Sequence, residues 1–233
     1  MSVDSTTGLK RTPLYDEHLA LGARMIAFAG WEMPVQYKGI LEEHAAVRSE
    51  AGMFDLCHMG QIEVRGRGSF ELLQYLTTND LARVGPFQAQ YSLMLDHDGG
   101  VIDDVICYRL DDAVSDEGPR YLLVVNASNS EEDFEWVRSF ALKRERVQVE
   151  NLSGQRALIG IQGPRSEQVL ERVLNGAREE SQFGWGAKGR AGSVVSELGY
   201  FRCLYASILD RPVLVARTGY TGEDGFEIFS DSR

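Results

Sequence analysis

The feature that most constrains the fold is a pair of strand-like segments joined by a short, glycine-rich connection. Residues 90–95 and 101–110 are rich in apolar and β-branched side chains, and the five residues between them read DHDGG. Asp and Gly tolerate the backbone conformations that a tight turn requires, so this spacing predicts a β-hairpin. The chain is therefore expected to contain an antiparallel pair of strands at this point.

The segments around the hairpin alternate between strand and helix patterns. Strands are predicted at 61–65, 121–126 and 147–149, and helices at 70–76 and after Ser128. Ser128 and Glu131 have the spacing of a capping box, which favours a helix start there. This order predicts the α+β class, with helices packed on antiparallel sheets.

The flanking regions follow the same logic less regularly. A helix is expected over 41–53 with Gly52 as its stop, and a second helix from Ser166. Short strands are expected at 157–161, 213–217 and 226–229, and residues 111–120 read as a polar loop. The sequence GWGAKG at 184–189 has the spacing of a dinucleotide-binding turn. It follows polar residues rather than a strand and precedes a strand-like run, so we interpret it as a loop.

Composition narrows the class of protein. The chain has 24 Lys and Arg against 35 Asp and Glu, a formal net charge of −11, which is the wrong sign for a general nucleic-acid binder. The three cysteines and four histidines are scattered without ligand-like spacing, so no metal site is expected. No apolar run approaches the roughly 20 residues of a membrane-spanning helix, and the start has no secretory pattern. These observations favour a cytoplasmic protein that does not enter a membrane.

Two adjacent aspartates in the second hairpin strand form the first candidate site. Because side chains alternate across a strand, Asp104 shares a face with Ile102 and Ile106, whereas Asp103 shares the other with Val105. A carboxylate therefore lies in an apolar row in either case, which is costly unless it is hydrogen-bonded, paired or used in chemistry. The alternatives at this point are a functional aspartate and one that caps the hairpin through backbone N–H groups.

The second candidate site is the glycine-rich segment RTGYTGEDGFE at 217–227. Its glycines allow tight turns and close approach, and Glu227 lies in the apolar strand that follows. A carboxylate there can accept two N–H donors from the amidine edge of a heterocycle; the alternative is an ion pair with an arginine such as Arg217. Tyr91 in the first hairpin strand and Asn126 at a strand end are either ligand contacts or structural residues.

A set of short motifs, each weak alone, resembles the aminomethyltransferase, or T-protein, family of the glycine cleavage system. They occur in the family's order and run through the whole chain. The motifs are TPLY at 12–15, AGWEMP at 29–34, GMFD at 52–55, HMG at 58–60, GGVIDD at 99–104, VNA at 125–127, QGP at 162–164 and the segment at 217–227.

This resemblance implies a tetrahydrofolate-dependent transferase that uses no metal. In the family, the aminomethyl group on the lipoyl arm of the H-protein passes to tetrahydrofolate, giving 5,10-methylenetetrahydrofolate and ammonia, and contact with the H-protein is transient. Asp104 matches the catalytic aspartate, which is the second of the Asp pair, and Glu227 matches the glutamate that anchors the pterin. Tyr91, Asn126 and Tyr220 match positions that line the folate pocket.

The resemblance also implies a T-protein-like folate-binding fold divided into domains. Residues 1–55 with 153–233 would form a discontinuous first domain and residues 56–152 an inserted second one, with the family's C-terminal β-barrel absent. Cys57 stands where the family usually has Ser. The alternative is a related, non-catalytic folate-binding module of the iron–sulfur maintenance type; its K-G-C-Y-x-G-Q-E signature is not matched by TGYTGE at 218–223, which lacks the cysteine. A sarcosine- or dimethylglycine-oxidising enzyme would need a fused flavin domain, for which no strand-associated fingerprint is present.

Overall fold

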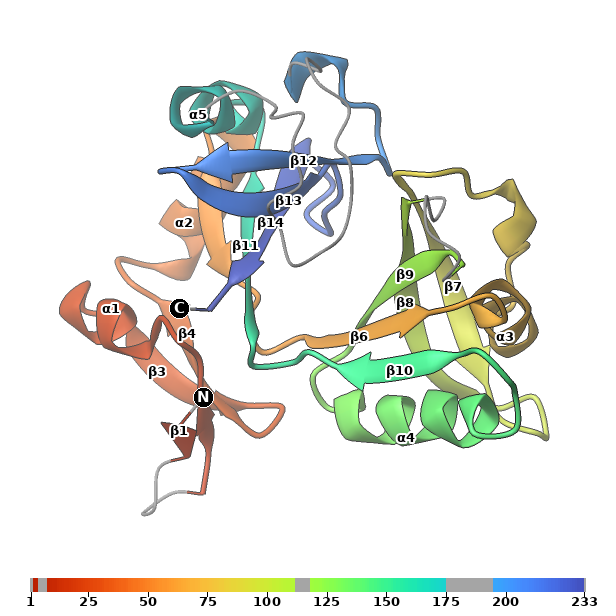
Figure 1. Cartoon of the computed structure of the whole chain (residues 1–233). Coiled ribbons are helices and arrows are strands. Elements are labelled where there is room, and N and C mark those ends of the chain that lie inside the picture. The colour runs from red at the N-terminus through yellow and green to blue at the C-terminus, as the bar shows by residue number, and fades with distance from the viewer. Residues whose placement is uncertain (1, 4–7, 112–117, 175–194, 233) are drawn as a thin grey trace. The chain divides into compact units, whose positions relative to one another are not determined.

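A computed structural model describes residues 2–3, 8–111, 118–174 and 195–232 of the chain. The polypeptide forms two units that are described separately here. Unit 1 contains Met1–His58, Gly154–Tyr200 and Leu204–Arg233, and unit 2 contains Met59–Ser153 and Phe201–Cys203. Helices and mostly antiparallel sheets make up both units (Figure 1), which confirms the predicted α+β class.

Unit 2 is built on a five-stranded antiparallel sheet with the order β10-β6-β9-β8-β7. Its strands are β6 (Gly60–Arg65), β7 (Gln88–Leu95), β8 (Val101–Asp111), β9 (Arg120–Val125) and β10 (Gln148–Asn151). The predicted hairpin is confirmed as β7 and β8, and Gly99 in its connection has a φ of 84°. The left-handed conformation at this position suits glycine, which has no Cβ to clash.

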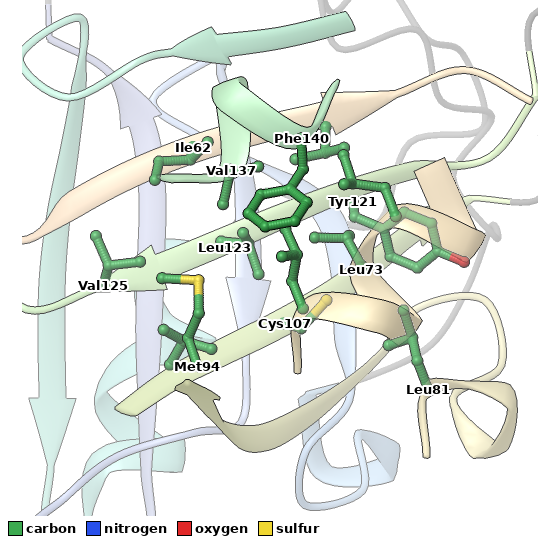
Figure 2. Packing of buried hydrophobic residues seen from close by; sticks show 14 of the residues in the cluster. Ile62, Leu73, Leu81, Met94, Cys107, Tyr121, Leu123, Val125, Val137 and Phe140 are labelled. Carbon is green, nitrogen blue, oxygen red and sulfur yellow. The ribbon is translucent and has the colours of Figure 1, made fainter. Parts of the chain in front are cut away.

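One face of this sheet is covered by α3 (Ser69–Leu76) and α4 (Ser130–Ala141), with the short 3₁₀ helix η1 (Leu81–Arg83) beside them. Leu73 from α3 and Val137 from α4 are completely buried against Ile62 and Leu123 of the sheet (Figure 2). Burying a side chain of this size contributes about 1.5–3 kcal/mol. The helical spacing of apolar residues in α3 and α4 therefore creates the main core of unit 2.

The start of α4 differs from the predicted capping box. The helix begins at Ser130, its N-cap residue is Asn129, and no side chain caps its first turn. The Ser128 hydroxyl instead donates to Asn129 Oδ1 at 3.1 Å. The Asn129 amide is in turn bonded to Asp103 Oδ1 on β8, at 2.9 Å. A tertiary contact has thus replaced the local capping interaction that the sequence spacing suggests.

Unit 1 contains two sheets. The smaller sheet has the order β1-β2-β4-β3, and its strands are β1 (Ser2–Val3), β2 (Lys10–Arg11), β3 (Arg24–Phe28) and β4 (Trp31–Gln36). The larger sheet has the order β12-β13-β14-β11-β5, and its strands are β5 (Gly52–Asp55), β11 (Arg156–Gln162), β12 (Cys203–Ile208), β13 (Arg211–Ala216) and β14 (Gly225–Asp231). The predicted helix over 41–53 overlaps only the first two residues of β5.

The helices of unit 1 are α1 (Tyr15–Ala20), α2 (Ile40–Ser49) and α5 (Ser166–Val173), with η2 (Val195–Glu197) as a 3₁₀ turn. Leu170 of α5 packs with Val215, Phe226 and other apolar residues of the larger sheet. Helix α2 is shorter than predicted, because Gly52 begins β5 and pairs with Gln162 of β11. Leu41 in α2 is 85% exposed, so the apolar face expected there is not buried.

A partly buried hydrogen-bond chain joins α1 to β5 in unit 1. The Thr12 hydroxyl donates to Asp55 Oδ2 at 2.6 Å, and His18 Nε2 lies 2.8 Å from the same oxygen. The Tyr37 hydroxyl lies 2.8 Å from His18 Nδ1. Burial raises the pKa of Asp55, but the hydrogen bonds from Thr12, His18 and the Cys57 backbone outweigh it and bring the pKa below its ordinary value.

Two sequence interpretations lie outside the described residues: the GWGAKG loop at 184–189 and most of the loop at 111–120. Among the helices of the described ranges, none has the length and apolar character needed to cross a membrane.

Candidate functional site

The aspartate pair of β8 is divided between the two faces of its sheet. Asp103 faces the core side with Val105 and Cys107 and is only 4% exposed. Asp104 lies on the opposite face and is half-buried. The sequence pattern could not decide which carboxylate is buried, because both share a row with apolar residues. Asp103 is therefore the buried aspartate that accepts hydrogen bonds, and Asp104 is the partly exposed one.

Asn126 links the two carboxylates. It directly follows β9, which is paired with β8, so the antiparallel register brings it opposite the aspartates. Its backbone N–H donates to Asp103 Oδ2 at 2.9 Å, and its side-chain Nδ2 donates to Asp103 Oδ1 at 2.8 Å. The same Nδ2 lies 3.0 Å from Asp104 Oδ1 and 3.3 Å from the Asp104 carbonyl. Hydrogen bonds to charged groups are the stronger kind, so this amide fixes the Asp104 carboxylate.

Tyr91 lies on the neighbouring strand β7. It pairs with Ile106 of β8, two residues from Asp104, so alternation places the Tyr91 and Asp104 side chains on the same sheet face. Tyr91 is 45% exposed. Unit 2 thus brings together three of the five predicted site residues, with an accessible ring, a fixed carboxylate and an amide.

Glu227 and Tyr220 belong to unit 1. Glu227 is a half-buried residue of β14, and the Thr218 hydroxyl donates to its Oε2 at 2.5 Å. Its cross-strand neighbour on β11 is Gly160, which contributes no side chain next to the carboxylate. Arg217 is the arginine named above as an alternative partner for Glu227. Arg217 pairs with Asp224 and Glu167.

Gln162 forms hydrogen bonds to the glycine-rich loop that carries Tyr220. This side chain is 3% exposed; its Nε2 donates to the Thr218 carbonyl at 3.1 Å, and the Thr221 hydroxyl donates to its Oε1 at 3.0 Å. A Cβ on Gly219 would lie 2.0 Å from Gln162 Oε1, and one on Gly225 would lie 2.4 Å from it. A side chain at either glycine would therefore displace this amide from its hydrogen bonds.

Two arginines form ion pairs with acidic residues of the same loop. Arg48 Nη1 donates to the Thr221 carbonyl at 3.1 Å and pairs with Glu223 at 2.9 Å. Arg217 Nη2 lies 2.6 Å from Asp224 Oδ2. Tyr220 at the tip is 97% exposed. The result is an anchored loop that presents one aromatic ring.

Sequence reasoning missed two polar residues that support these positions, Gln162 and Thr218. Gln162 enters the sequence analysis only within the QGP motif at 162–164, and Thr218 only within the segment at 217–227, without a role for either side chain. Within the described ranges, no group of three or more His, Cys, Asp or Glu side chains is arranged to hold a metal ion.

Comparison with known proteins gives this arrangement a context. The profile of the GCVT N-terminal domain family matches residues 14–233, which is nearly the whole chain. The chain belongs to the GCVT N-terminal domain family. The candidate residues of both units, including Asp104 and Glu227, lie inside the matched range.

Curated relatives of this GCVT-family chain carry the name aminomethyltransferase. One from Desulfitobacterium hafniense is 44% identical over 223 residues, covering 96% of this chain and 54% of the relative. One from Symbiobacterium thermophilum is 45% identical over 228 residues, with 95% and 54% covered. The crystal structure of the glycine cleavage system aminomethyltransferase T from Bartonella henselae superposes with a TM-score of 0.78 at 36% identity, covering 96% of this chain and 54% of that one. The chain thus spans about half the length of these relatives.

Proposed function

We propose that the chain takes part in tetrahydrofolate-dependent aminomethyl transfer in glycine cleavage, as the transferase. The family match over residues 14–233 supports this proposal, together with one geometric observation. Asp104, the residue at the position of the family's catalytic aspartate, is half-buried and held at 3.0 Å by the Asn126 amide. A carboxylate fixed in this way can take up or release a proton at a defined point without reorganising first.

In the proposed reaction the aminomethyl carbon on the lipoyl sulfur of the H-protein moves to tetrahydrofolate. Its bonds to nitrogen and to sulfur break, and bonds to the N5 and N10 atoms of the folate form. The two protons lost from those nitrogens leave with ammonia and with the thiol of the dihydrolipoyl arm. Asp104 is assigned to orient the pterin ring and manage the proton at its reacting nitrogen, which is general acid–base work.

The remaining residues are assigned to binding of tetrahydrofolate as a co-substrate. The Glu227 carboxylate would accept two N–H groups from the amidine edge of the pterin, with Thr218 fixing its orientation at Oε2. Tyr91 and Tyr220 would supply aromatic surface, and Asn126 a polar contact. The H-protein is the proposed transient partner, and the cytoplasm the proposed location.

The first test is a calorimetric titration of the chain with tetrahydrofolate under reducing conditions, followed by an assay of transfer from aminomethylated H-protein. We expect saturable binding by the parent. Glu227→Ala should weaken binding about 10- to 100-fold, because it removes hydrogen bonds to a charged group. Asp104→Asn should keep the fold and most of the affinity but lower turnover by about 10²–10⁴-fold, the usual range for a lost acid–base group.

The matched control for Asp104→Asn is Asp98→Asn, in the exposed connection of the same hairpin. This variant should bind and turn over like the parent. If Asp104→Asn and Glu227→Ala both behave like the parent, the assignment of the two carboxylates is wrong. Folate binding without any transfer by the parent would favour the non-catalytic folate-binding alternative.

A further inference from the structure

Asp103 is a buried carboxylate to which the proposed reaction gives no role. It lies on the core side of β8 and is 4% exposed. The backbone N–H of Asn126 donates to its Oδ2 at 2.9 Å, and the side-chain amides of Asn126 and Asn129 donate to its Oδ1 at 2.8 and 2.9 Å. Three donors stabilise the charged carboxylate, which accepts hydrogen bonds and donates none.

Two backbone carbonyls decide which way the asparagine amides point. The Ile102 carbonyl lies 3.1 Å from Asn129 Nδ2, and the Asp104 carbonyl lies 3.3 Å from Asn126 Nδ2. A backbone carbonyl can only accept a hydrogen bond, so the NH₂ group of each side chain, and not its oxygen, belongs at this place. Both amides therefore donate to Asp103.

The orientation of the Asn126 amide decides which group Asp104 meets. Asn126 Nδ2 lies 2.8 Å from Asp103 Oδ1 and 3.0 Å from Asp104 Oδ1, so one NH₂ group serves both carboxylates. If the amide were turned over, its oxygen would face two carboxylates, and the negative charges would repel each other. A residue at position 103 that can only accept hydrogen bonds therefore favours the orientation in which Asn126 donates to Asp104.

We propose that Asp103 is a positioning residue, which keeps the NH₂ group of Asn126 turned toward Asp104 and thereby holds the Asp104 carboxylate in place. A neutral amide at position 103 cannot do this. Its own NH₂ group would meet either the backbone N–H or the side-chain amide of Asn126, and turning the Asn126 amide over would relieve the second conflict. The part of this inference that concerns turnover rests on the proposed role of Asp104, whereas the arrangement of hydrogen bonds does not.

The first experiment follows the Asn126 side-chain amide in the parent chain. Its NH₂ signals are observed by ¹⁵N-edited NMR and assigned with Asn126→Asp. We expect these hydrogens to exchange with water at least about tenfold more slowly than those of an asparagine in a short peptide, because they are bonded to charged groups. Exchange as fast as in the peptide would overturn the proposal, whatever the outcome of the folate experiments.

The second experiment compares Asp103→Asn with Asn129→Ala. Asp103→Asn keeps the size of the side chain and replaces one acceptor by a donor, whereas Asn129→Ala removes hydrogen bonds to Asp103 and to the Ile102 carbonyl but leaves the carboxylate in place. Protection of the Asn126 amide from exchange should fall at least about tenfold in Asp103→Asn and stay within about threefold of the parent in Asn129→Ala.

Equal protection of the Asn126 amide in these two variants would refute the positioning role, because a general loss of stability would then explain both. If Asp103→Asn does not fold, the exchange measured in the parent and in Asn129→Ala decides. Loss of protection in Asn129→Ala would in that case overturn the proposal, since this variant retains the Asp103 carboxylate.

The third readout is kinetic. Because Asp103 acts through Asp104, Asp103→Asn should lower kcat at least about tenfold with a smaller change in KM, and Asn129→Ala should keep kcat within about threefold of the parent. Equal kcat values for the two variants would also overturn the proposal. If the parent shows no transfer at all, the proposed function fails, while the exchange of the Asn126 amide still tests the arrangement of hydrogen bonds.

Discussion

Replacing Gln162 by Leu should remove the hydrogen bonds that anchor the loop carrying Tyr220 and lower the free energy of unfolding. Leu keeps the volume of the buried side chain but cannot donate to the Thr218 carbonyl or accept from the Thr221 hydroxyl. Thr218 is only 1% exposed, so loss of the hydrogen bond from Gln162 to its carbonyl should cost about 1–3 kcal/mol. Thr221 is half-buried and can turn to water, which adds roughly 0.5 kcal/mol. The expected total is about 1.5–3.5 kcal/mol of unfolding free energy.

Urea-induced unfolding followed by far-UV circular dichroism measures this loss. With a slope of about 2–3 kcal/mol per molar urea, the midpoint should fall by roughly 1 M. Thr221→Val is the matched control, because it removes one of the two contacts and leaves Gln162 bonded to Thr218; it should cost less than about 1 kcal/mol. A cost for Gln162→Leu no larger than that of Thr221→Val would refute the reasoning that the buried amide anchors the loop.

Two further predictions concern titration in the native chain. Burial raises the pKa of Cys57 above its ordinary value and the pKa values of Cys107 and Cys203 to about 12. Because the thiolate is the reactive form, all three cysteines should resist a thiol reagent at pH 8 in the native chain and react fully in denaturant. Rapid labelling of any of them in the native chain would contradict this prediction. Asp55 has a lowered pKa in the fold, so its contribution to stability is present above about pH 4 and is lost as the pH falls through the folded value. Thr12→Val, which removes the 2.6 Å hydrogen bond to Asp55, should move the acid-unfolding midpoint to higher pH, and an unchanged midpoint would count against this contact.

The sequence was most informative where one local pattern decides the structure. The hairpin of β7 and β8 follows from its turn residues, and α3, α4 and α5 follow from apolar residues at helical spacing. The small sheet of β1 to β4 was missed, since its strands are short and β3 is largely exposed, which hides the alternation of buried and exposed residues. The helix predicted over 41–53 includes the first two residues of β5, because helix formers directly precede them.

The arrangement of the candidate site residues could be predicted from the sequence only in part. The pattern GGVIDD locates a carboxylate near the hairpin, but alternation alone cannot tell which aspartate faces the core. That choice depends on which face α3 and α4 cover, and the helices come from other parts of the chain. The contacts of Asn126 with Asp103 and Asp104 depend on strand register across β8 and β9. Such long-range pairing cannot be predicted from the pattern of any single segment.

The discontinuity of unit 1 has a consequence for how the protein is made. Strand β5 lies at the edge of its sheet and pairs only with β11, and Cys57 bonds to Leu158, which lies 101 positions further along the chain. A ribosome that adds about 5–20 residues per second takes roughly 5–20 s to supply that partner. During this interval β5 lacks its partner strand, while the ribosome makes Met59–Ser153, the main segment of unit 2. We therefore expect the inserted unit to mature before the larger sheet of unit 1, which closes only when the strands that follow unit 2 in the chain have been made.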